Sequence, residues 1–384
     1  MPPFEQQPNI QKDEGKAREE RIKELVKKTK KIGGLDRDKP KTVPEGGMEF
    51  NEYDEIVFTL QEIIDGEREY INDEGKPESL GMTAKEVLEN FTYTLIEQAV
   101  ENGEDAVNGD QSSVINFIRT ISAFSFFDEQ YKMDLLNKID DKLDQRLVIS
   151  VKDVLENKRF IYGMTTSIIS FTRRGISDDY FYENSSPQLF SQLIVSIFSL
   201  DQQYNTNLVK ILEGACQKEL NMTIKETLEN EKFVNNLTEG IGYNLEKIGG
   251  EGGMVFVLTI PALFSLGQQY NINLVEKIEN GLKQRLGSKM TIKKSLKNEE
   301  FINILTKEII TLVRNGISSR FGVYDEEEAK KYFLWIFRSL HQLIPHYQKL
   351  SEQERHQRKL QERYKGKKDL PPIPERRMWQ DVKS

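Results

Sequence analysis

The amino-acid sequence predicts an all-α protein, an α-solenoid of about four helical repeats of about 70 residues with extended charged arms at both ends. Three observations lead to this fold class. An eight-residue pattern recurs four times, apolar residues follow each copy at helical spacing, and no alternating pattern of strand length recurs. The chain of 384 residues, of which 37% are hydrophobic, is long enough to build such an array.

The recurring octet is TAKEVLEN from Thr83, SVKDVLEN from Ser150, TIKETLEN from Thr223 and TIKKSLKN from Thr291. Successive copies start 67, 73 and 68 residues apart. In the first three copies an acid stands three residues after the hydroxyl, which is the pattern of a capping box. Each octet therefore predicts a helix start that leads into a longer helix. The fourth copy has Lys294 in place of the acid, so we expect the weakest start there.

Two apolar faces accompany each octet. The first face follows the octet, where apolar residues recur at spacing four. The second face belongs to a separate pattern, in which a helix containing Phe-Ser is followed by a Tyr and then by four apolar residues at spacings of 3, 4 and 4. We call these four residues a ladder, because such spacings place them on one face of a helix. The first face comprises Phe160, Met164 and Ile168, then Phe233, Leu237 and Ile241, then Phe301, Leu305 and Ile309; the ladders are Leu136, Ile139, Leu143 and Leu147, then Val209, Leu212, Cys216 and Leu220, then Val275, Ile278, Leu282 and Leu286. Each unit thus predicts three or four helices. Cys216 stands where other copies have Leu, which predicts a small buried hydrophobe rather than a reactive thiol.

The organisation along the chain follows from these repeats. One amphipathic helix is predicted at 53–71, and the apolar segment 332–350, with Trp335, Phe337 and Leu340, is predicted to cap the end of the stack. No run of 18 apolar residues occurs, so no membrane span is predicted. We divide the chain into a basic N-terminal arm (1–47), a partial repeat or N-terminal cap (48–82), the repeat array (83–347, with units starting near 83, 150, 223 and 291), and a basic helix with a Pro-rich tail (348–384).

Charge is segregated between the body and the arms. Residues 1–44 carry +4 and residues 348–384 carry +5, and because the whole chain carries −8, the span between them carries −17. An acidic body disfavours a nucleic-acid interface along the whole array, whereas each basic arm can seek an anionic partner.

The sequence predicts no catalytic, cofactor-binding or metal-ligating residue, and no cofactor. The cluster IGGEGG (248–253) lacks the Lys-Ser/Thr ending of a phosphate loop, which favours an interhelical turn. His341, His346 and His356 lack the spacing of a zinc pair on one helical face, which favours a surface or helix-end role. The acid pairs Asp140 with Asp141 and Asp178 with Asp179 are expected on solvated surfaces, since no nucleophile accompanies them. We therefore expect a protein that is not an enzyme.

The arms carry the predicted interaction residues. Segment 17–32 could dock as a short amphipathic helix or remain a solvated charged linker. PPIPER (Pro371 to Arg376) satisfies the pattern of a Src-homology-3 ligand, with an ordinary anchoring tail as the alternative, and Trp379 is a candidate interface anchor. The predicted interaction residues are Lys27, Lys28, Lys30, Lys31, Arg358, Lys359, Arg363, Lys367, Lys368, Pro371, Pro374, Arg376, Arg377 and Trp379.

The segment SQLIVSIFSLDQQYNTNLVKILEGACQKELNMTIKETLEN (191–230) resembles the helical-hairpin repeats of octotricopeptide and heptatricopeptide proteins of organelles, and the resemblance extends over roughly residues 83–345. It implies an RNA-facing concave surface or a place in an organellar ribonucleoprotein. The sequence departs from these families in its acidic body and in having no recognisable RAP-type domain at its C-terminal end.

The leading expectation is a non-catalytic structural or scaffolding subunit of a large assembly, such as a mitochondrial ribosome, with other protein subunits as partners and RNA contact through the arms. The alternatives are an accessory subunit of a respiratory or cytoskeletal complex without RNA contact, and a Pro-motif adaptor. A mitochondrial location is expected, with the cytoplasm as the alternative. The acids Glu5, Asp13 and Glu14 are atypical of a mitochondrial presequence.

Overall fold

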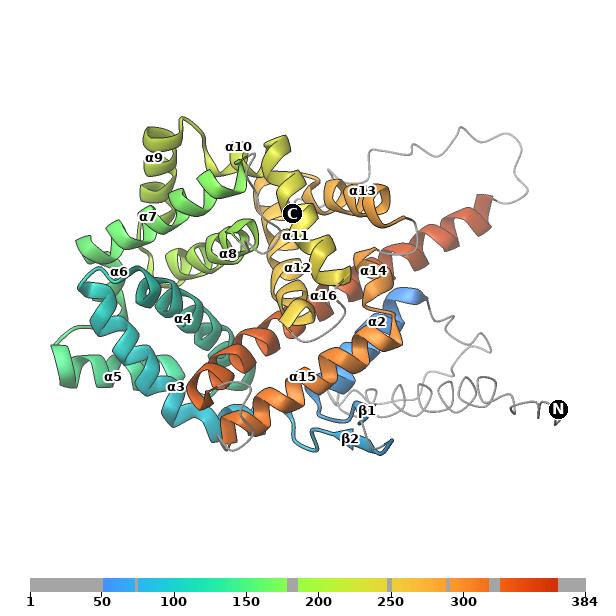
Figure 1. Ribbon diagram of the computed structural model, residues 1–384, viewed down its shortest axis with the longest axis horizontal. Helices are drawn as coiled ribbons and strands as arrows, with labels where there is room; N and C mark the ends of the chain where they lie inside the picture. Colours follow the sequence, from blue (N-terminus) through green and yellow to red (C-terminus); the bar gives the residue numbers. More distant parts are fainter. Residues whose placement is uncertain are drawn as a thin grey trace, which may run out of the picture. The chain divides into compact units, whose positions relative to one another are not determined.

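A computed structural model describes residues 51–72, 75–177, 186–246, 251–287, 291–317 and 325–364, all within the compact unit Asn51–Ser384. Helices dominate these residues, so the all-α prediction is confirmed (Figure 1). The described elements are α2 (Glu52–Ile64), β1 (Glu69–Ile71), β2 (Pro77–Ser79), α3 (Ala84–Val107), α4 (Gln111–Tyr131), α5 (Leu135–Leu147), α6 (Val151–Glu156), α7 (Lys158–Gly175), α8 (Ser186–Tyr204), α9 (Leu208–Leu220), α10 (Ile224–Glu229), α11 (Glu231–Glu246), α12 (Glu251–Tyr270), α13 (Leu274–Leu286), α14 (Ile292–Ser295), α15 (Glu299–Ile317) and α16 (Glu326–Tyr364).

A short hairpin interrupts the helix predicted at 53–71. Helix α2 ends at Ile64, and β1 pairs antiparallel with β2 in the register that places Tyr70 opposite Glu78. Gly66 at the turn has a φ of +69°, and a Cβ there would lie 2.0 Å from the carbonyl oxygen of Met82. The turn therefore requires glycine, and it ends the helix earlier than the apolar periodicity predicts.

The octets form helix starts, as predicted. Thr83, Ser150 and Thr223 each accept a hydrogen bond from the backbone N–H three residues on, and the acid at that position accepts from the cap residue in return. Thr291 accepts from the Lys294 N–H without the returning acid, and α14 has only four residues. The first octet differs from the other three because it opens one continuous helix of 24 residues, α3, instead of a short helix followed by a long one.

The Asn that ends each later octet explains the handover between helices. The side-chain oxygens of Asn157, Asn230 and Asn298 accept hydrogen bonds from the backbone N–H groups of Phe160, Phe233 and Phe301, at 3.3, 3.2 and 3.0 Å. Each Asn therefore caps the long helix that follows the short one.

The long helices pack in a repeated order. Helices α4, α8, α12 and α16 each contact the next, and α16 contacts α4 again. Helix α3 lies against α16 and α4, α7 against α4 and α8, α11 against α8 and α12, and α15 against α12 and α16 (Figure 1). The inner helices, which are α4, α8, α12 and α16, therefore form a closed circuit of contacts, and each of the other four helices lies against two neighbours in it.

Edge-to-face pairs of phenylalanine rings recur at corresponding contacts. Such pairs add about 0.5–1.5 kcal/mol beyond the burial of the rings. The pairs, with ring centres 5.1–6.0 Å apart, are Phe117–Phe160, Phe190–Phe233, Phe256–Phe301 and Phe91–Phe333. The predicted first face is confirmed as core, since all nine of its residues are buried.

The predicted ladders lie on α5, α9 and α13, three helices of 13 residues each. The two central positions of each ladder are buried and the two outer ones are half-buried. Cys216 is fully buried, and burial, helped by the charge of Glu213, raises the pKa of its thiol to about 11. This confirms its prediction as a core residue.

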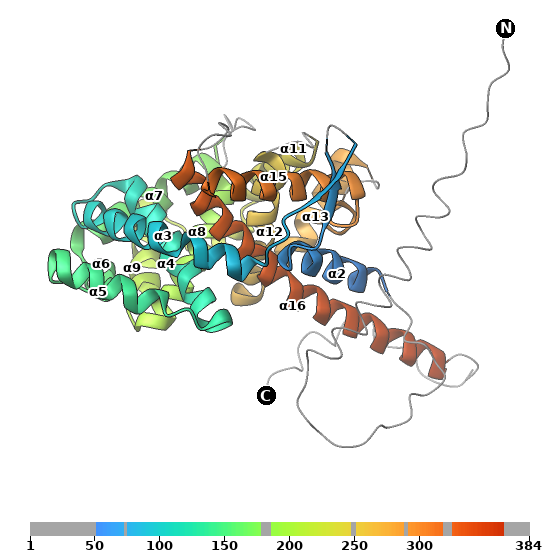
Figure 2. The ribbon, with the colours of Figure 1, turned by 90° about the horizontal axis from the view of Figure 1, so that it is seen from below.

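Helix α16 lies at the centre of the packing. The sequence instead predicts that this segment caps the end of a stack. The helix spans 39 residues, runs through Pro345, and crosses the predicted boundary at 347/348. It contacts α2, α3 and α4 from the N-terminal part of the unit as well as α12 and α15 (Figures 1 and 2). Its apolar residues are thus buried from several sides, which explains why they are more numerous than in the other units.

Contact between α2 and α16 joins the two ends of the described chain (Figure 2). Asp54 accepts hydrogen bonds from the Ser351 hydroxyl at 2.6 Å and from Arg355 at 2.5 Å. Asn51 donates to the Ser351 backbone and hydroxyl oxygens at 3.1 and 3.0 Å. Helix α2 packs on α16, whereas α5, α9 and α13 pack on α4, α8 and α12 and also on α3, α7 and α11. All four helices precede an octet.

Helix α12 has the length and apolar composition of a membrane span over Gly252–Tyr270, among the residues that the structure describes. Of that window, 61% is buried inside the protein, as in a core helix.

We expect the backbone amides of α14 to exchange with solvent hydrogen before those of α6 and α10, because only the start at Thr291 lacks the acid of the capping box. Hydrogen exchange followed by mass spectrometry or NMR measures this order. Equal protection of the three short helices would contradict it.

We expect Asp54→Asn to lower the free energy of unfolding by about 1–3 kcal/mol at pH 7, because it removes charge-assisted hydrogen bonds in a largely buried contact. Burial raises the pKa of Asp54, but hydrogen bonds from Ser351, Asn51 and Arg355 outweigh it and hold the pKa below its ordinary value of 3.8. The stabilisation is therefore present above pH 3.8 and is lost as the pH falls through the lower folded-state value.

Urea denaturation at several pH values measures the effect of Asp54→Asn. The control is Glu89→Gln, which breaks an exposed pair with Lys85 of 3.7 Å and should change stability by less than about 0.5 kcal/mol. Equal effects of the two variants, or a pH-independent effect at Asp54, would overturn the role given to this contact.

Candidate functional site

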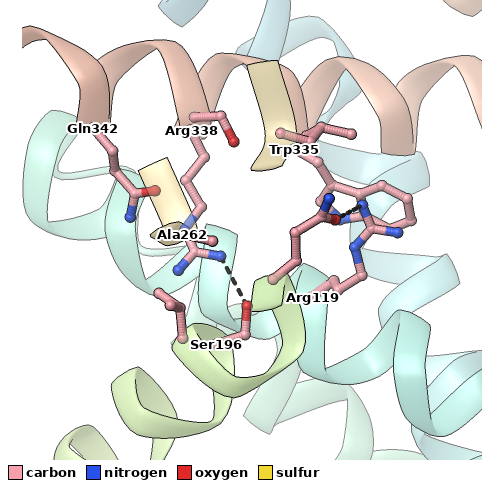
Figure 3. A pocket seen from close by; sticks show the side chains of 10 residues that line it. Arg119, Ser196, Ala262, Trp335, Arg338 and Gln342 are labelled. Carbon is pink, nitrogen blue, oxygen red and sulfur yellow. Dashed lines mark hydrogen bonds between the residues drawn. The ribbon is translucent and has the colours of Figure 1, made fainter. Parts of the chain in front are cut away.

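The arginine pocket lies where all four inner helices meet. Its volume is about 30 Å³, two to three times what one water molecule needs. It is lined by Arg119 of α4, by Gln192, Val195 and Ser196 of α8, by Leu258 and Ala262 of α12, and by Trp335, Arg338, Ser339 and Gln342 of α16 (Figure 3). The closed circuit of inner helices therefore brings residues far apart in the sequence to one place.

Arg119 lies on the inner side of α4, whose other faces bury Phe117, Ile118 and Ile121 in the core. Its guanidinium stacks on the Trp335 ring, 3.6 Å from the ring centre, and donates to the side-chain oxygen of Gln192 at 3.1 Å (Figure 3). The stacking and the hydrogen bond fix the orientation of the charged group.

Arg338 reaches from α16 toward α8, where its Nη1 donates to the Ser196 hydroxyl at 3.2 Å (Figure 3). Only 9% of its surface is exposed. Its Nε is buried without a hydrogen-bond partner among the described residues, and so is the indole Nε1 of Trp335. The pocket thus holds donors that the described part of the chain does not satisfy.

No acidic side chain in the described part of the chain forms an ion pair with either arginine. Burial lowers the pKa of both guanidiniums to about 10, and the charge of Arg338 adds to the effect at Arg119. Both groups therefore carry their charge at pH 7. Arg338 is buried and Arg119 is half-buried, and two like charges so placed, with no acid of the described residues paired to them, are costly because the loss of hydration is not offset by an opposite charge.

A larger cavity, the histidine cavity, lies beside the arginine pocket and shares Gln342 with it. Its volume is about 720 Å³. Pro261 and Pro345 line it, and a proline within a helix leaves the carbonyl oxygen four residues earlier without its helical donor. The lining residues are Gln61, Ile64 and Asp65 of α2, Phe126, Gln130 and Tyr131 of α4, Pro261, Phe264, Ser265 and Gln268 of α12, and His341, Gln342, Ile344, Pro345, His346 and Lys349 of α16.

The predicted surface or helix-end role of the histidines is wrong for two of the three. His341 and His346 are half-buried within α16, whereas His356 is exposed. The Nε2 of His341 lies 2.6 Å from the Tyr131 hydroxyl, and the His346 ring stacks on Phe264 with ring centres 3.4 Å apart. The spacing of five residues between His341 and His346 does not predict their burial, because neighbouring helices cover α16 on several sides.

Both imidazoles are neutral at pH 7. Burial lowers the pKa of His341 to about 4, and burial together with the charge of Lys349 does the same for His346. Burial raises the pKa of Tyr131 to about 12 and raises that of Asp65, which accepts two hydrogen bonds from Gln61. The histidine cavity therefore presents uncharged rings, amides, one weakened acid and the charged amine of Lys349. No group of three or more His, Cys, Asp or Glu residues suited to hold a metal ion occurs among the described residues.

Most of the predicted interaction residues lie outside the described residues. Arg358 and Lys359 are exposed on α16, and Arg358 pairs with Glu354 at 2.6 Å. Arg363 lies on the last turn of α16, and its side chain is outside the described part, as are Lys27, Lys28, Lys30, Lys31, Lys367, Lys368, Pro371, Pro374, Arg376, Arg377 and Trp379.

Two other candidates from the sequence receive structural positions. Asp140 is half-buried and accepts a hydrogen bond from the Val151 backbone at 2.6 Å, so it supports the second octet and is not a solvated surface acid. Burial raises its pKa. Residues 251–253 of the glycine cluster begin α12, whereas its residues 248–250 and the pair Asp178 and Asp179 lie outside the described residues.

The sequence analysis missed Arg119 and Arg338. A signal was present, because each is the single charged residue in an otherwise apolar or weakly polar stretch, VINFIRTISAF and YFLWIFRSLHQL. A lone arginine in such a stretch is unusual for a buried helix face. The partner helix that completes the pocket could not be identified from the sequence.

Comparisons with protein-family models, with curated proteins and with solved structures gave no match. The resemblance to organellar helical-repeat proteins therefore stays a prediction.

We expect the stability of the protein to fall as the pH drops from 7 toward 4.5, in part because unfolding lets His341 and His346 bind protons at their ordinary pKa of 6.5. Each histidine contributes up to about 1.4 kcal/mol per pH unit to this slope. His346→Asn should make the slope shallower than in the wild type, as measured by urea denaturation.

The matched control is His356→Asn, on the exposed part of α16, which should leave the slope unchanged. Acids with raised pKa values, such as Asp65, titrate in all variants and cancel in the difference. If stability fell with pH as steeply in His346→Asn as in the wild type, the burial of this imidazole would be contradicted.

Proposed function

We propose that this protein is a non-catalytic structural scaffold, built as a closed array of four helical units, that serves as a subunit of a larger assembly. Units one to three each consist of an octet, two long helices and one helix of the ladder type. The fourth consists of α14, α15 and α16 and is completed by α2 from the N-terminal end of the array.

The proposal rests on one observation: the residues that recur in the sequence cap helices or pack in the core. The Ser and Thr of the octets cap helices, the Asn residues of the later octets cap the next helices, and the recurring Phe residues pack edge-to-face. Repeated capping and packing residues favour a rigid, regular framework. Such frameworks serve mainly as binding surfaces for other macromolecules.

The specific assembly that we propose is an organellar ribonucleoprotein, with the mitochondrial ribosome as the leading example. This rests on the charge of the arms, since residues 348–384 carry +5 and residues 1–44 carry +4, against −17 in the body. The acidic body disfavours phosphate contact, so RNA contact is assigned to the arms. An accessory subunit of another complex, or an adaptor that uses the motif at Pro371 to Arg376, would have the same body without RNA.

Affinity purification of the tagged full chain from its own cells, followed by mass spectrometry and RNA sequencing, tests the proposal. We expect a defined set of proteins and an RNA that is lost above moderate salt, because phosphate contacts weaken as salt rises. A chain lacking residues 1–47 and 365–384 is the matched variant. It keeps Asn51, Ser351 and Arg355, so the contact between α2 and α16 remains intact.

Three outcomes separate the candidates. Loss of RNA with retention of protein partners in the truncated chain supports the ribonucleoprotein subunit. Protein partners without RNA in either chain support the accessory subunit, and capture of a Src-homology-3 protein that depends on Pro371 and Pro374 supports the adaptor. Recovery of the chain alone in both preparations would reject the scaffold.

A further inference from the structure

The arginine pocket has the chemistry of an anion-binding site, a property that goes beyond the scaffold proposed above. We propose that it binds a tetrahedral dianionic oxyanion, the phosphate group of a ligand or free inorganic phosphate, between Arg119 and Arg338. This inference stands on the geometry of the pocket and does not depend on the proposed assembly.

The charges of Arg119 and Arg338 need compensation. A guanidinium removed from water requires compensation, either by an acid, by loss of its proton or by a bound anion. No acid in the described residues pairs with Arg119 or Arg338, and a pKa of about 10 leaves both protonated at pH 7. A bound anion is the remaining means of neutralisation.

The lining of the pocket supplies the donors that an oxyanion needs. Beside the two guanidiniums stand the hydroxyls of Ser196 and Ser339 and the amide of Gln342, and none of the described residues that line the pocket is an acid. Among the described residues, the Nε of Arg338 and the Nε1 of Trp335 have no hydrogen-bond partner. Arg338 is more than nine-tenths buried and lies with its guanidinium inside the pocket (Figure 3). These donors match the acceptor oxygens of a phosphate.

The orientation of the arginines is already fixed without a ligand. Arg119 is held by the Trp335 ring at 3.6 Å and by Gln192 at 3.1 Å, and Gln192 in turn donates to the Thr259 hydroxyl at 3.3 Å. Arg338 is held by Ser196. A pre-oriented pair of guanidiniums loses little side-chain freedom when an anion binds.

Charge and size select the class of anion. Two guanidiniums carry +2, which a dianion such as phosphate balances, whereas a chloride or a single carboxylate leaves one charge uncompensated. The pocket of about 30 Å³ has room for more than one water-sized atom but not for a large headgroup. A phosphate group therefore suits both the charge and the space.

The adjoining histidine cavity offers space for the organic part of a phosphate ester. It shares Gln342 with the arginine pocket and has a volume of about 720 Å³, lined by aromatic rings and amides. An organic body attached to the phosphate would have space there, whereas free inorganic phosphate would leave it unused. A phosphomonoester is therefore expected to bind more tightly than inorganic phosphate if the ligand is an organic phosphate.

Thermal unfolding of the full chain tests the site. The probes are inorganic phosphate, glycerol phosphate and succinate, each added at constant ionic strength against sodium chloride. Phosphate should raise the Tm of the wild type in a saturable manner, because a ligand that binds the folded state stabilises it by mass action. Arg119→Gln and Arg338→Gln should each lower the affinity for phosphate at least about tenfold, because each removes a charged hydrogen-bond donor.

The same variants give a second readout without ligand. Arg338→Gln should raise the Tm of the ligand-free protein, because it removes a buried charge that nothing in the pocket neutralises. An arginine with a structural role would lower the Tm instead. Arg174→Gln, which changes an exposed arginine on α7, is the charge-matched control and should leave the phosphate response unchanged.

Tryptophan fluorescence reports the site directly in a chain that carries Trp379→Phe, since Trp335 is then the only tryptophan. Phosphate should change the Trp335 emission with the same saturation as the Tm. This titration uses the intact pocket, so it stays decisive even if the arginine variants fold poorly.

Three kinds of result would overturn the inference, two of which concern the response to phosphate. One is the absence of any Tm or fluorescence response to phosphate and glycerol phosphate in the wild type, and the other is an equal phosphate response in Arg338→Gln and Arg174→Gln. Succinate binding as tightly as phosphate would reject the tetrahedral oxyanion. Tighter binding of glycerol phosphate assigns the site to an organic phosphate, and equal or weaker binding assigns it to free phosphate.

Discussion

The contact of α16 with helices from both ends of the described chain is the constraint on which the rest of this structure depends. An amphipathic helix needs one covered face, but α16 buries residues on several sides, from Ala329 and Phe333 to Tyr347 and Ser351. Helices α12 and α15 cover part of it, and α2, α3 and α4 cover the rest. Without the N-terminal helices, these apolar side chains would face water. The burial of α16 therefore requires its contacts with the N-terminal helices.

The closed circuit of inner helices also determines where charged side chains lie in the protein. The described body carries many acids, and the ion pairs that it makes lie largely at the surface, as between Lys293 and Glu52 at 2.7 Å. The inner helices instead bring Arg119 and Arg338 to one pocket, where no acid of the described residues pairs with them. This segregation places positive potential inside an acidic protein, and a low local dielectric makes that potential stronger than the same charges would produce at the surface. The arginine pocket is thus a consequence of the packing order, since each of the four inner helices contributes part of its lining.

Local chemistry made much of the fold predictable. The octets specify helix starts through a hydroxyl and an acid three residues apart, and both groups act within one turn, so no distant contact is needed. The ladders specify α5, α9 and α13 for the same reason, since burial at spacings of three and four follows from helix geometry. Predictions that depended on distant contacts failed. The hairpin after α2 follows from the approach of Gly66 to Met82, and the burial of His341 follows from Tyr131 on another helix.

The sequence by itself determined the helical class, the phase of the repeats, the burial of Cys216 and the segregation of charge between body and arms. It did so because these properties depend on the spacing of residue types along the chain, which a helix converts directly into faces and caps. Only the tertiary structure decided that α16 is central rather than terminal, that α2 packs on α16, and that two arginines 219 positions apart share one pocket. These depend on which helix covers which, and amphipathic helices with similar faces do not encode their neighbours in their own periodicity.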